Sequence, residues 1–300
     1  MIAIQVCILF SLMPNVSVII PTFDRAHLIE ESVSSVLSQT FKPKEVIVVD
    51  DGSSDKTWDV LKNLGFSLSE SRKNTLRYIY KENGGVSSAR NIGIELSSSE
   101  YVALLDSDDQ WKPSKLEAQL SSLKKESFSC RVSHTDEIWI RNGIRVNPHK
   151  KHGKNGGDLF EKCLKMCCIS PSSALIHRSV FNDLGGFDES LKACEDYDFW
   201  LRYCAFEQTH FVNEQLTIKN GGHSDQLSQK YWGMDRLRIY SLEKLLKNKN
   251  LSRSKYELAL TELILKLKIL MNGSMKRGKK DFTDELNRKI IHFESLLDNE

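Results

Sequence analysis

The sequence predicts an α/β protein built on a mainly parallel sheet. Short runs rich in β-branched residues alternate with helix-period segments through the first half of the chain, which is the pattern of βαβ units. Polar residues directly follow each predicted strand, and right-handed crossovers place the carboxyl ends of such strands along one edge. With 300 residues, 40% of them hydrophobic, the chain can bury a sizeable core.

The predicted strands of the first half are four short apolar runs, at Val16–Ile20, Glu45–Val49, Leu76–Tyr80 and Tyr101–Leu105. Helical periodicity lies between them, at His27–Ser38, Lys56–Leu64 and Val86–Leu96. In open α/β sheets the ligand site is the crevice beyond the carboxyl ends of the strands. We therefore expect the loops that follow these strands to converge on one site.

The next part of the chain predicts a helix, a hairpin, a basic loop and another helix, at Pro113–Lys125, Arg131–Asn147, 149–157 and Asp158–Cys167. The hairpin signal is the Asn142–Gly143 pair. From about Tyr231 the pattern predicts three charged amphipathic helices, with a break at Asn272–Gly273. The predicted domains are an apolar extension at 1–15, an α/β domain at 16–228 and a helical region at 229–300.

Composition limits the possible partners and compartments. The 42 basic and 40 acidic residues give a net charge of +2, so no overall field favours nucleic acid. Seven cysteines without regular spacing favour buried thiols in a reducing, cytoplasmic setting over a disulfide scaffold or a soft-metal site. The apolar start of the chain is too short to span a bilayer and lacks the features of a signal peptide.

Basic residues on the C-terminal helices suggest contact with the inner face of the cell membrane; they include Lys244, Lys247, Lys249, Arg253 and Lys255. The alternatives are an ordinary solvated face and an oligomer interface. The sequence does not decide between them.

An acidic cluster ends the fourth predicted strand. Asp106, Asp108 and Asp109 follow the run VALL within four residues. In an extended segment Asp106 and Asp108 point the same way, so both can approach one divalent cation. Hard oxygen ligands favour Mg²⁺ or Mn²⁺, whereas an ordinary surface turn is the alternative interpretation.

Two other loops carry candidate nucleotide contacts. Asp50 and Asp51 end the second strand, where a carboxylate can accept a hydrogen bond from a ring N–H such as that of uracil, while Asp55 is expected to cap the next helix. The segment ENGGVSSARNIG has neither a Rossmann fingerprint nor a Walker lysine, so its polar residues are the candidates, namely Asn83, Arg90 and Asn91. Arg90 could equally form a structural ion pair with Asp106 or Asp51.

Six ordered segments together resemble the family 2 inverting glycosyltransferases of the GT-A fold. They are SVIIPTFDRAHLIEESVSSVLSQT, EVIVVDDGSSDKT, ENGGVSSARNIG, YVALLDSDDQW, GGFDESL and EDYDFWLR, and they lie within residues 16–205. The resemblance implies a GT-A fold, a nucleotide-diphosphate sugar donor and a metal-bound diphosphate.

The resemblance also implies roles for individual residues. It places Pro21, Thr22, Asp50, Asp51, Asn83 and Arg90 around the nucleoside, and Asp106 and Asp108 at the ribose and the metal-bound diphosphate. Direct displacement at an anomeric carbon needs a base for the acceptor hydroxyl. By similarity to the family's Glu-Asp pair, Asp196 is the expected base and Glu195 supports the acceptor side. The alternative for these carboxylates, above all for Asp198, is charge complementarity at the start of a helix. A loose correspondence puts His223 near the metal.

The predicted function is metal-dependent transfer of a sugar from a nucleotide-diphosphate sugar to a glycan or lipid-linked acceptor in cell-surface polysaccharide synthesis. A UDP-sugar is the expected donor, and GDP- and dTDP-sugars are the alternatives. One rival is a nucleotidyltransferase that forms sugar nucleotides, and it would need a phosphate-binding loop near the first strand. A second rival is a non-catalytic subunit that binds nucleotide sugars. Donor sugar, acceptor and oligomeric state do not follow from the sequence.

Overall fold

The computed structural model describes residues 13–69, 71, 73–222 and 231–298, which form two compact units. The first unit holds the chain up to Gly157, Ile169–Glu189 and the segment that begins at Gln208. The second holds Asp158–Cys168, Ser190–Glu207 and the C-terminal helices. The second unit therefore draws two segments from within the predicted 16–228 domain.

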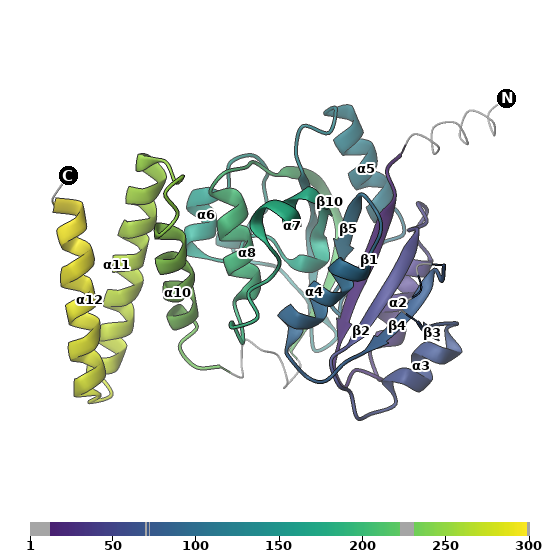
Figure 1. Cartoon of the computed structure of the whole chain (residues 1–300), viewed down its shortest axis with the longest axis horizontal. Helices are drawn as coiled ribbons and strands as arrows, with labels where there is room; N and C mark the ends of the chain where they lie inside the picture. Colours follow the sequence, from purple (N-terminus) through teal and green to yellow (C-terminus); the bar gives the residue numbers. More distant parts are fainter. Residues whose placement is uncertain (1–12, 70, 72, 223–230, 299–300) are drawn as a thin grey trace. The chain divides into compact units, whose positions relative to one another are not determined.

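A single mixed sheet forms the centre of the first unit (Figure 1). Among the described residues its ten strands have the order β3-β4-β2-β1-β5-β9-β7-β10-β6, with β8 paired to β7. Their bounds are β1 Val16–Thr22, β2 Glu45–Asp50, β3 Ser67–Leu68, β4 Leu76–Tyr80, β5 Tyr101–Leu104, β6 Gln110–Trp111, β7 Val132–Arg141, β8 Ile144–Val146, β9 Ala174–His177 and β10 His210–Gly221. Strands β1, β2, β4 and β5 are parallel, as predicted.

The helices of the first unit are α2 Ile29–Leu37, α3 Thr57–Asn63, α4 Val86–Leu96, α5 Lys115–Lys125 and α7 Ser179–Leu184. Two short 3₁₀ turns add η1 Lys150–His152 and η2 Pro171–Ser173. Helix α4 lies across β1 and β2 (Figure 1). This close approach needs Gly93, because a Cβ there would meet the Ile19 Cγ2 atom at 2.3 Å.

The predicted hairpin is confirmed as β7–β8. Its turn residues Asn142 and Gly143 have φ angles of 49° and 77°, the left-handed pair that a tight hairpin turn requires. The core is made of strand and helix residues that are fully buried, such as Ile20, Val48 and Leu120. Trp111, which follows the acidic residues Asp106, Asp108 and Asp109, is only 3% exposed, and its Nε1 donates to the Ser172 carbonyl at 2.7 Å. It therefore packs in the core.

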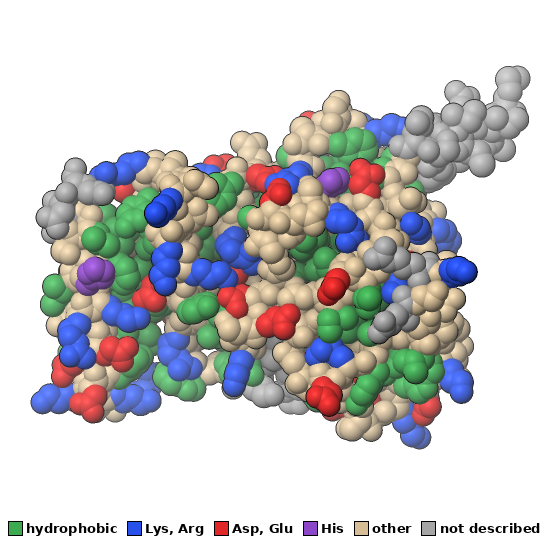
Figure 2. Space-filling view, in the orientation of Figure 1, with side chains coloured by type: hydrophobic (Ala, Val, Ile, Leu, Met, Phe, Trp, Pro, Cys, Tyr) green, Lys and Arg blue, Asp and Glu red, His purple; other side chains and the backbone are tan. Residues whose placement is uncertain are grey.

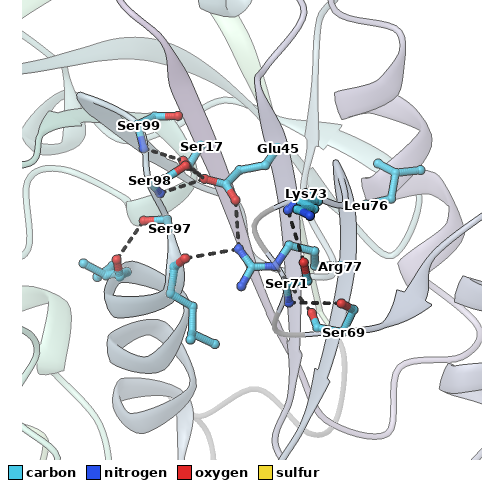
Figure 3. Close-up of polar contacts among 12 residues, drawn as sticks. Ser17, Glu45, Ser69, Ser71, Lys73, Leu76, Arg77, Ser97, Ser98 and Ser99 are labelled. Carbon is cyan, nitrogen blue, oxygen red and sulfur yellow. Dashed lines mark hydrogen bonds and ion pairs between the residues drawn. The ribbon is translucent and has the colours of Figure 1, made fainter.

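A closed polar network lies at the amino ends of the parallel strands (Figure 3). The Arg77 Nη1 atom lies 2.8 Å from a Glu45 carboxylate oxygen, and the other oxygen accepts from Ser17 and Ser98. Burial alone would raise the pKa of Glu45, but these hydrogen bonds outweigh it and hold that pKa below its usual range. Because its polar groups are paired, the network stabilises the sheet.

The second unit is helical. Its helices are α6 Phe160–Lys165, α8 Glu195–Cys204, α10 Asp235–Leu246, α11 Arg253–Met275 and α12 Lys280–Asp298. The break predicted at Asn272–Gly273 is wrong, because α11 continues to Met275 and the turn forms around Gly278, with φ 65°. Packing along the buried face of α11 offsets the helix cost of one glycine, about 1 kcal/mol. None of the described helices is long and apolar enough to cross a membrane.

Candidate functional site

The carboxyl ends of β1, β2 and β4 lie in register. Thr22 pairs with Asp50, and Asp50 pairs with Tyr80. The loops after these strands are also tied together, because the Asp24 carboxylate accepts hydrogen bonds from the Ser54 and Asp55 N–H groups. The predicted convergence of the first three loops is therefore confirmed.

The fourth loop is an acidic turn between β5 and β6. It closes through a hydrogen bond from the Asp109 N–H to the Asp106 carbonyl at 3.0 Å. The end of β10 lies against the turn, because the Asn220 side-chain amide donates to the Asp108 carbonyl at 2.8 Å. The Asn220 N–H also donates to the Asp109 carboxylate at 3.0 Å. Strand β10 thus fixes the shape of the turn.

Each carboxylate of the turn has a different cation. The Arg90 Nη2 lies 2.7 Å from an Asp106 carboxylate oxygen, and the Arg25 Nη2 lies 3.8 Å from an Asp108 carboxylate oxygen. The Lys219 Nζ lies 3.6 Å from an Asp109 carboxylate oxygen. The contact to Asp106 is a hydrogen-bonded ion pair, as one of the two interpretations of Arg90 expected. The other two are longer than a hydrogen bond. Asp108 and Asp109 are therefore only partly compensated.

The protonation equilibria follow from these contacts. Burial alone would raise the pKa of Asp106, but the Arg90 guanidinium outweighs it and lowers that pKa. Burial raises the pKa of Asp108 above its usual range, and the charge of Asp106 adds to the rise. Burial raises the pKa of Asp109 to about 7, although Lys219 acts in the opposite direction. The turn therefore holds negative charge at a cost and favours an added cation.

The residues present fit a divalent cation. The Asp106 and Asp108 side chains are 26% and 19% exposed, so both are accessible to a ligand. Among the described residues no group of three or more His, Cys, Asp or Glu side chains lies close enough together to hold a metal ion by itself. Mg²⁺ in phosphate sites is commonly held by one or two carboxylates together with substrate phosphates, so two carboxylates match this kind of site.

The first loop presents groups suited to a nucleoside. The Thr22 hydroxyl is buried, and within the described chain it has no hydrogen-bond partner. Phe23, next to it, is 47% exposed, which sequence reasoning missed. Pro21 lies within β1 and is buried, so it shapes the strand end. A bound nucleobase could form a hydrogen bond with the buried Thr22 hydroxyl and stack on the exposed Phe23 ring.

The carboxylates of the second loop have protein partners. Asp50 accepts from the Ser53 N–H at 2.7 Å and from the Tyr78 hydroxyl at 2.7 Å. The Asp51 carboxylate accepts hydrogen bonds from the N–H groups of Gly84 and Gly85 and from the Lys81 ammonium. These hydrogen bonds tie the second loop to the third. Both residues thus orient the loops, and their direct contact with a nucleotide stays a prediction.

The third loop serves partly as a structural anchor. The Asn83 side-chain amide donates to the Asp51 carbonyl at 2.9 Å. Asn91 holds the GGFDESL segment, since its side-chain oxygen accepts from the Phe187 N–H at 2.8 Å and its amide donates to the Phe187 carbonyl. The Arg90 guanidinium lies 5.2 Å from the centre of the Phe187 ring. Arg90 and Asn91 therefore organise the site from within.

A second buried charge pair flanks Lys219 on the same sheet. Glu137 accepts from Ser170 at 2.6 Å and pairs with Lys154 at 3.2 Å, a residue of the basic loop. Burial alone would raise the pKa of Glu137, but Lys154 and Lys219 outweigh it and lower that pKa to about 2. Sequence reasoning missed both lysines, because nothing local distinguishes them from surface lysines.

The expected base lies in the second unit, at the start of α8. Asp196 is half-buried, and its carboxylate accepts from the Tyr197 N–H at 2.7 Å and from the Cys167 thiol at 3.1 Å. Glu195 is 6% exposed. Asp198 is fully buried and pairs with Lys244 at 3.0 Å. His223 lies outside the described residues.

Comparisons with known proteins identify the fold and the family. The described fold matches a crystal structure of S. aureus TarS, residues 1–349, with a TM-score of 0.64 and 19% identity over 84% of this chain and 71% of that one. The model of glycosyl transferase family 2 matches residues 17–185. The chain belongs to glycosyl transferase family 2.

Curated relatives agree with this family. An uncharacterized glycosyltransferase of Rickettsia typhi is 35% identical over 217 residues, which cover 71% of this chain and 65% of the relative. The Escherichia coli protein WfgD, a UDP-Glc:alpha-D-GlcNAc-diphosphoundecaprenol beta-1,3-glucosyltransferase, is 36% identical over 62% of this chain and 68% of its own length. The chain thus spans slightly less than two thirds of the Rickettsia relative.

Proposed function

We propose that this protein transfers a sugar from a nucleoside-diphosphate sugar, with UDP as the nucleotide, to a hydroxyl group of a lipid-linked glycan. The donor and acceptor classes are those in the name of WfgD, which is 36% identical to this chain. Bacterial surface polysaccharide is the expected product. The family membership argues against a nucleotidyltransferase that forms sugar nucleotides.

The acidic turn is the observation that carries the proposal. Asp108 is a half-buried carboxylate with a raised pKa and an ion pair of 3.8 Å as its compensating contact. Asp108, assisted by Asp106, would hold Mg²⁺ or Mn²⁺, which when bound neutralises the developing charge of the leaving diphosphate. Thr22 and Phe23 would receive the nucleoside at the neighbouring strand ends.

The chain's own residues supply positioning and a base. Asp196 would accept the proton of the acceptor hydroxyl as that oxygen forms its bond to the anomeric carbon and the bond to the diphosphate breaks. Glu195 would orient the acceptor. Arg90 keeps Asp106 ionised, because the 2.7 Å ion pair lowers the pKa of that carboxyl. Contact with the membrane through the C-terminal helices would bring the enzyme to its acceptor.

The test is release of UDP from a panel of UDP-sugars with a lipid-linked acceptor. We expect activity with Mn²⁺ or Mg²⁺ and none with EDTA. Asp108→Asn and Asp196→Asn should each abolish transfer, whereas Asp59→Asn and Asp284→Asn, which change exposed carboxylates of α3 and α12, should leave it unchanged. Full turnover in Asp196→Asn would contradict the assignment of Asp196 as the base. Turnover in EDTA would contradict the requirement for a metal ion.

A further inference from the structure

Helix α11 is apolar on two opposite faces. One face packs into the second unit through buried residues such as Leu260, Leu263 and Leu267. The other exposes Leu258, Leu265 and Ile269, which are 37%, 50% and 53% exposed. Spacings of seven and four residues align these three side chains along one line of the helix, here called the apolar stripe. A solvated helix face would carry polar residues at these positions.

The apolar stripe points toward a strongly basic turn. The turn between α11 and α12, together with the first residue of α12, contains four cations in five residues, at Lys276, Arg277, Lys279 and Lys280, here called the basic turn. Lys276 continues the line of the stripe, since it follows Ile269 by seven residues. Figure 2 shows blue side chains, with some red ones among them, at the lower ends of α11 and α12, and green side chains above them. Apolar and cationic groups thus share one surface of the second unit.

An exposed tryptophan adjoins the basic turn. Trp232 is 56% exposed, with the Arg236 guanidinium 3.7 Å and the Lys279 ammonium 4.7 Å from its ring centre. The ring lines a pocket of about 340 Å³ whose apolar floor includes Leu270 and Phe282. Leu270 and Ser274, which also line this pocket, follow Ile269 by one and five residues, so the pocket lies against a different side of α11 from the apolar stripe.

Three of the five basic positions named from sequence have carboxylate partners within the second unit. Lys244 pairs with Asp198 at 3.0 Å, Lys255 pairs with Asp158 at 3.5 Å, and Arg253 pairs with a glutamate of its own helix. Their charges are used within the second unit. The basic turn is followed directly by three acidic residues at the start of α12, namely Asp281, Asp284 and Glu285.

We propose that the apolar stripe and the basic turn form one membrane-contact surface for an anionic phospholipid bilayer. The apolar side chains enter the boundary between headgroups and acyl chains, and the cations contact lipid phosphates. Both are required, because either contribution alone gives weak, reversible binding. The proposal concerns the second unit alone and does not depend on the sugar-transfer reaction.

The test is co-sedimentation of the full chain with phosphatidylcholine vesicles that contain either no anionic lipid or 30% phosphatidylglycerol. We expect binding to the anionic vesicles that weakens with added salt. Lys276→Glu/Lys280→Glu should weaken vesicle binding at least about tenfold, since each basic residue near an anionic membrane strengthens binding about fivefold. Both lysines are exposed, so folding should be retained and is checked by thermal melting.

Two further variants sharpen the test. Lys247→Glu/Lys249→Glu makes the same charge change on exposed residues at the other end of α11 and should leave binding within about twofold. Leu265→Gln/Ile269→Gln should weaken binding at least about tenfold. Equal loss in the two lysine variants, equal binding to neutral vesicles or absence of binding would overturn the proposal. So would a dimer, seen by light scattering, that the glutamine variant dissociates without changing vesicle binding.

Discussion

The two ends of the parallel strands hold buried charge in opposite ways. At the amino ends, Glu45 and Arg77 form an ion pair of 2.8 Å, and serine donors complete the carboxylate. At the carboxyl ends, Asp108 and Asp109 have cations at 3.8 Å and 3.6 Å, and within the described chain one Asp109 oxygen has no hydrogen bond. The closed network contributes stability. The open cluster sacrifices some stability, as binding sites commonly do.

The largest expected effect concerns the closed network. Glu45→Ala leaves the fully buried Arg77 without its carboxylate, so the free energy of unfolding should fall by about 3–5 kcal/mol. Chemical denaturation of the purified variant measures this. Asp108→Asn is the matched change at the other end, and its free energy of unfolding should stay the same or rise. A comparable loss in both variants would show that the two ends do not differ.

The second effect concerns catalysis. Asp108→Asn should lower the rate of sugar transfer at least about hundredfold, because it removes the carboxylate expected to hold the cation. The rate of UDP release with saturating Mn²⁺ measures this. A folded Glu45→Gln variant, assayed below its melting temperature, should retain nearly full activity. If Glu45→Gln lost activity and Asp108→Asn kept it, the assignment of Asp108 to the reaction and of Glu45 to stability would be contradicted.

The third effect is a pair of opposite pH dependences in metal-free protein. The folded pKa of Asp109, about 7, lies above the unfolded value of about 3.9, so its contribution to stability is full below pH 4 and is lost as pH rises through 7. The folded pKa of Glu45 is lowered, so its contribution is present above the unfolded value of about 4.3 and is lost as pH falls below it.

Comparison with the variants isolates these contributions. Between pH 8 and pH 5.5 in EDTA, the wild type should gain up to about 2 kcal/mol of stability relative to Asp109→Asn. The difference in the free energy of unfolding between the wild type and Glu45→Gln should shrink only below about pH 4.5. Urea denaturation across this range supplies the numbers, and a flat difference for Asp109→Asn would contradict the role of burial.

The smallest effect concerns competition for Asp108. Arg25 lies 3.8 Å from that carboxylate, so Arg25→Gln should lower the Mn²⁺ concentration for half-maximal binding by about two- to fivefold. Fluorescence or paramagnetic titration with Mn²⁺ alone measures this. Lys42→Gln, which removes an exposed lysine, is the control and should cause no change. Weaker Mn²⁺ binding in Arg25→Gln would instead make the arginine part of the site.

Local sequence patterns were sufficient for the elements that carry the site. The strands ending at Thr22, Asp50, Tyr80 and Leu104 were predicted to within two residues, because alternation and turn signals are local properties. The convergence of their loops followed from the handedness of the crossovers. The helix break at Asn272–Gly273 failed because packing along α11 overrides the local preference of one Asn-Gly pair.

The partners of the acidic turn could not be predicted. Lys219 and Asn220 reach it only because β10 pairs with β6, about a hundred residues earlier in the chain. Nor could a sequence tell that the Asp50 and Asp51 carboxylates face protein donors rather than open space. Such contacts depend on strand register and loop closure, which are set by the whole sheet.

Calorimetric titration of UDP into the wild type and Asp108→Asn, each with Mn²⁺ and with EDTA, tests the central claim most directly. If the acidic turn holds a divalent cation against a diphosphate, UDP binds the wild type at least tenfold more tightly with Mn²⁺ than with EDTA, and Asp108→Asn loses that difference. Binding of UDP that is equally tight in all four titrations would contradict the claim.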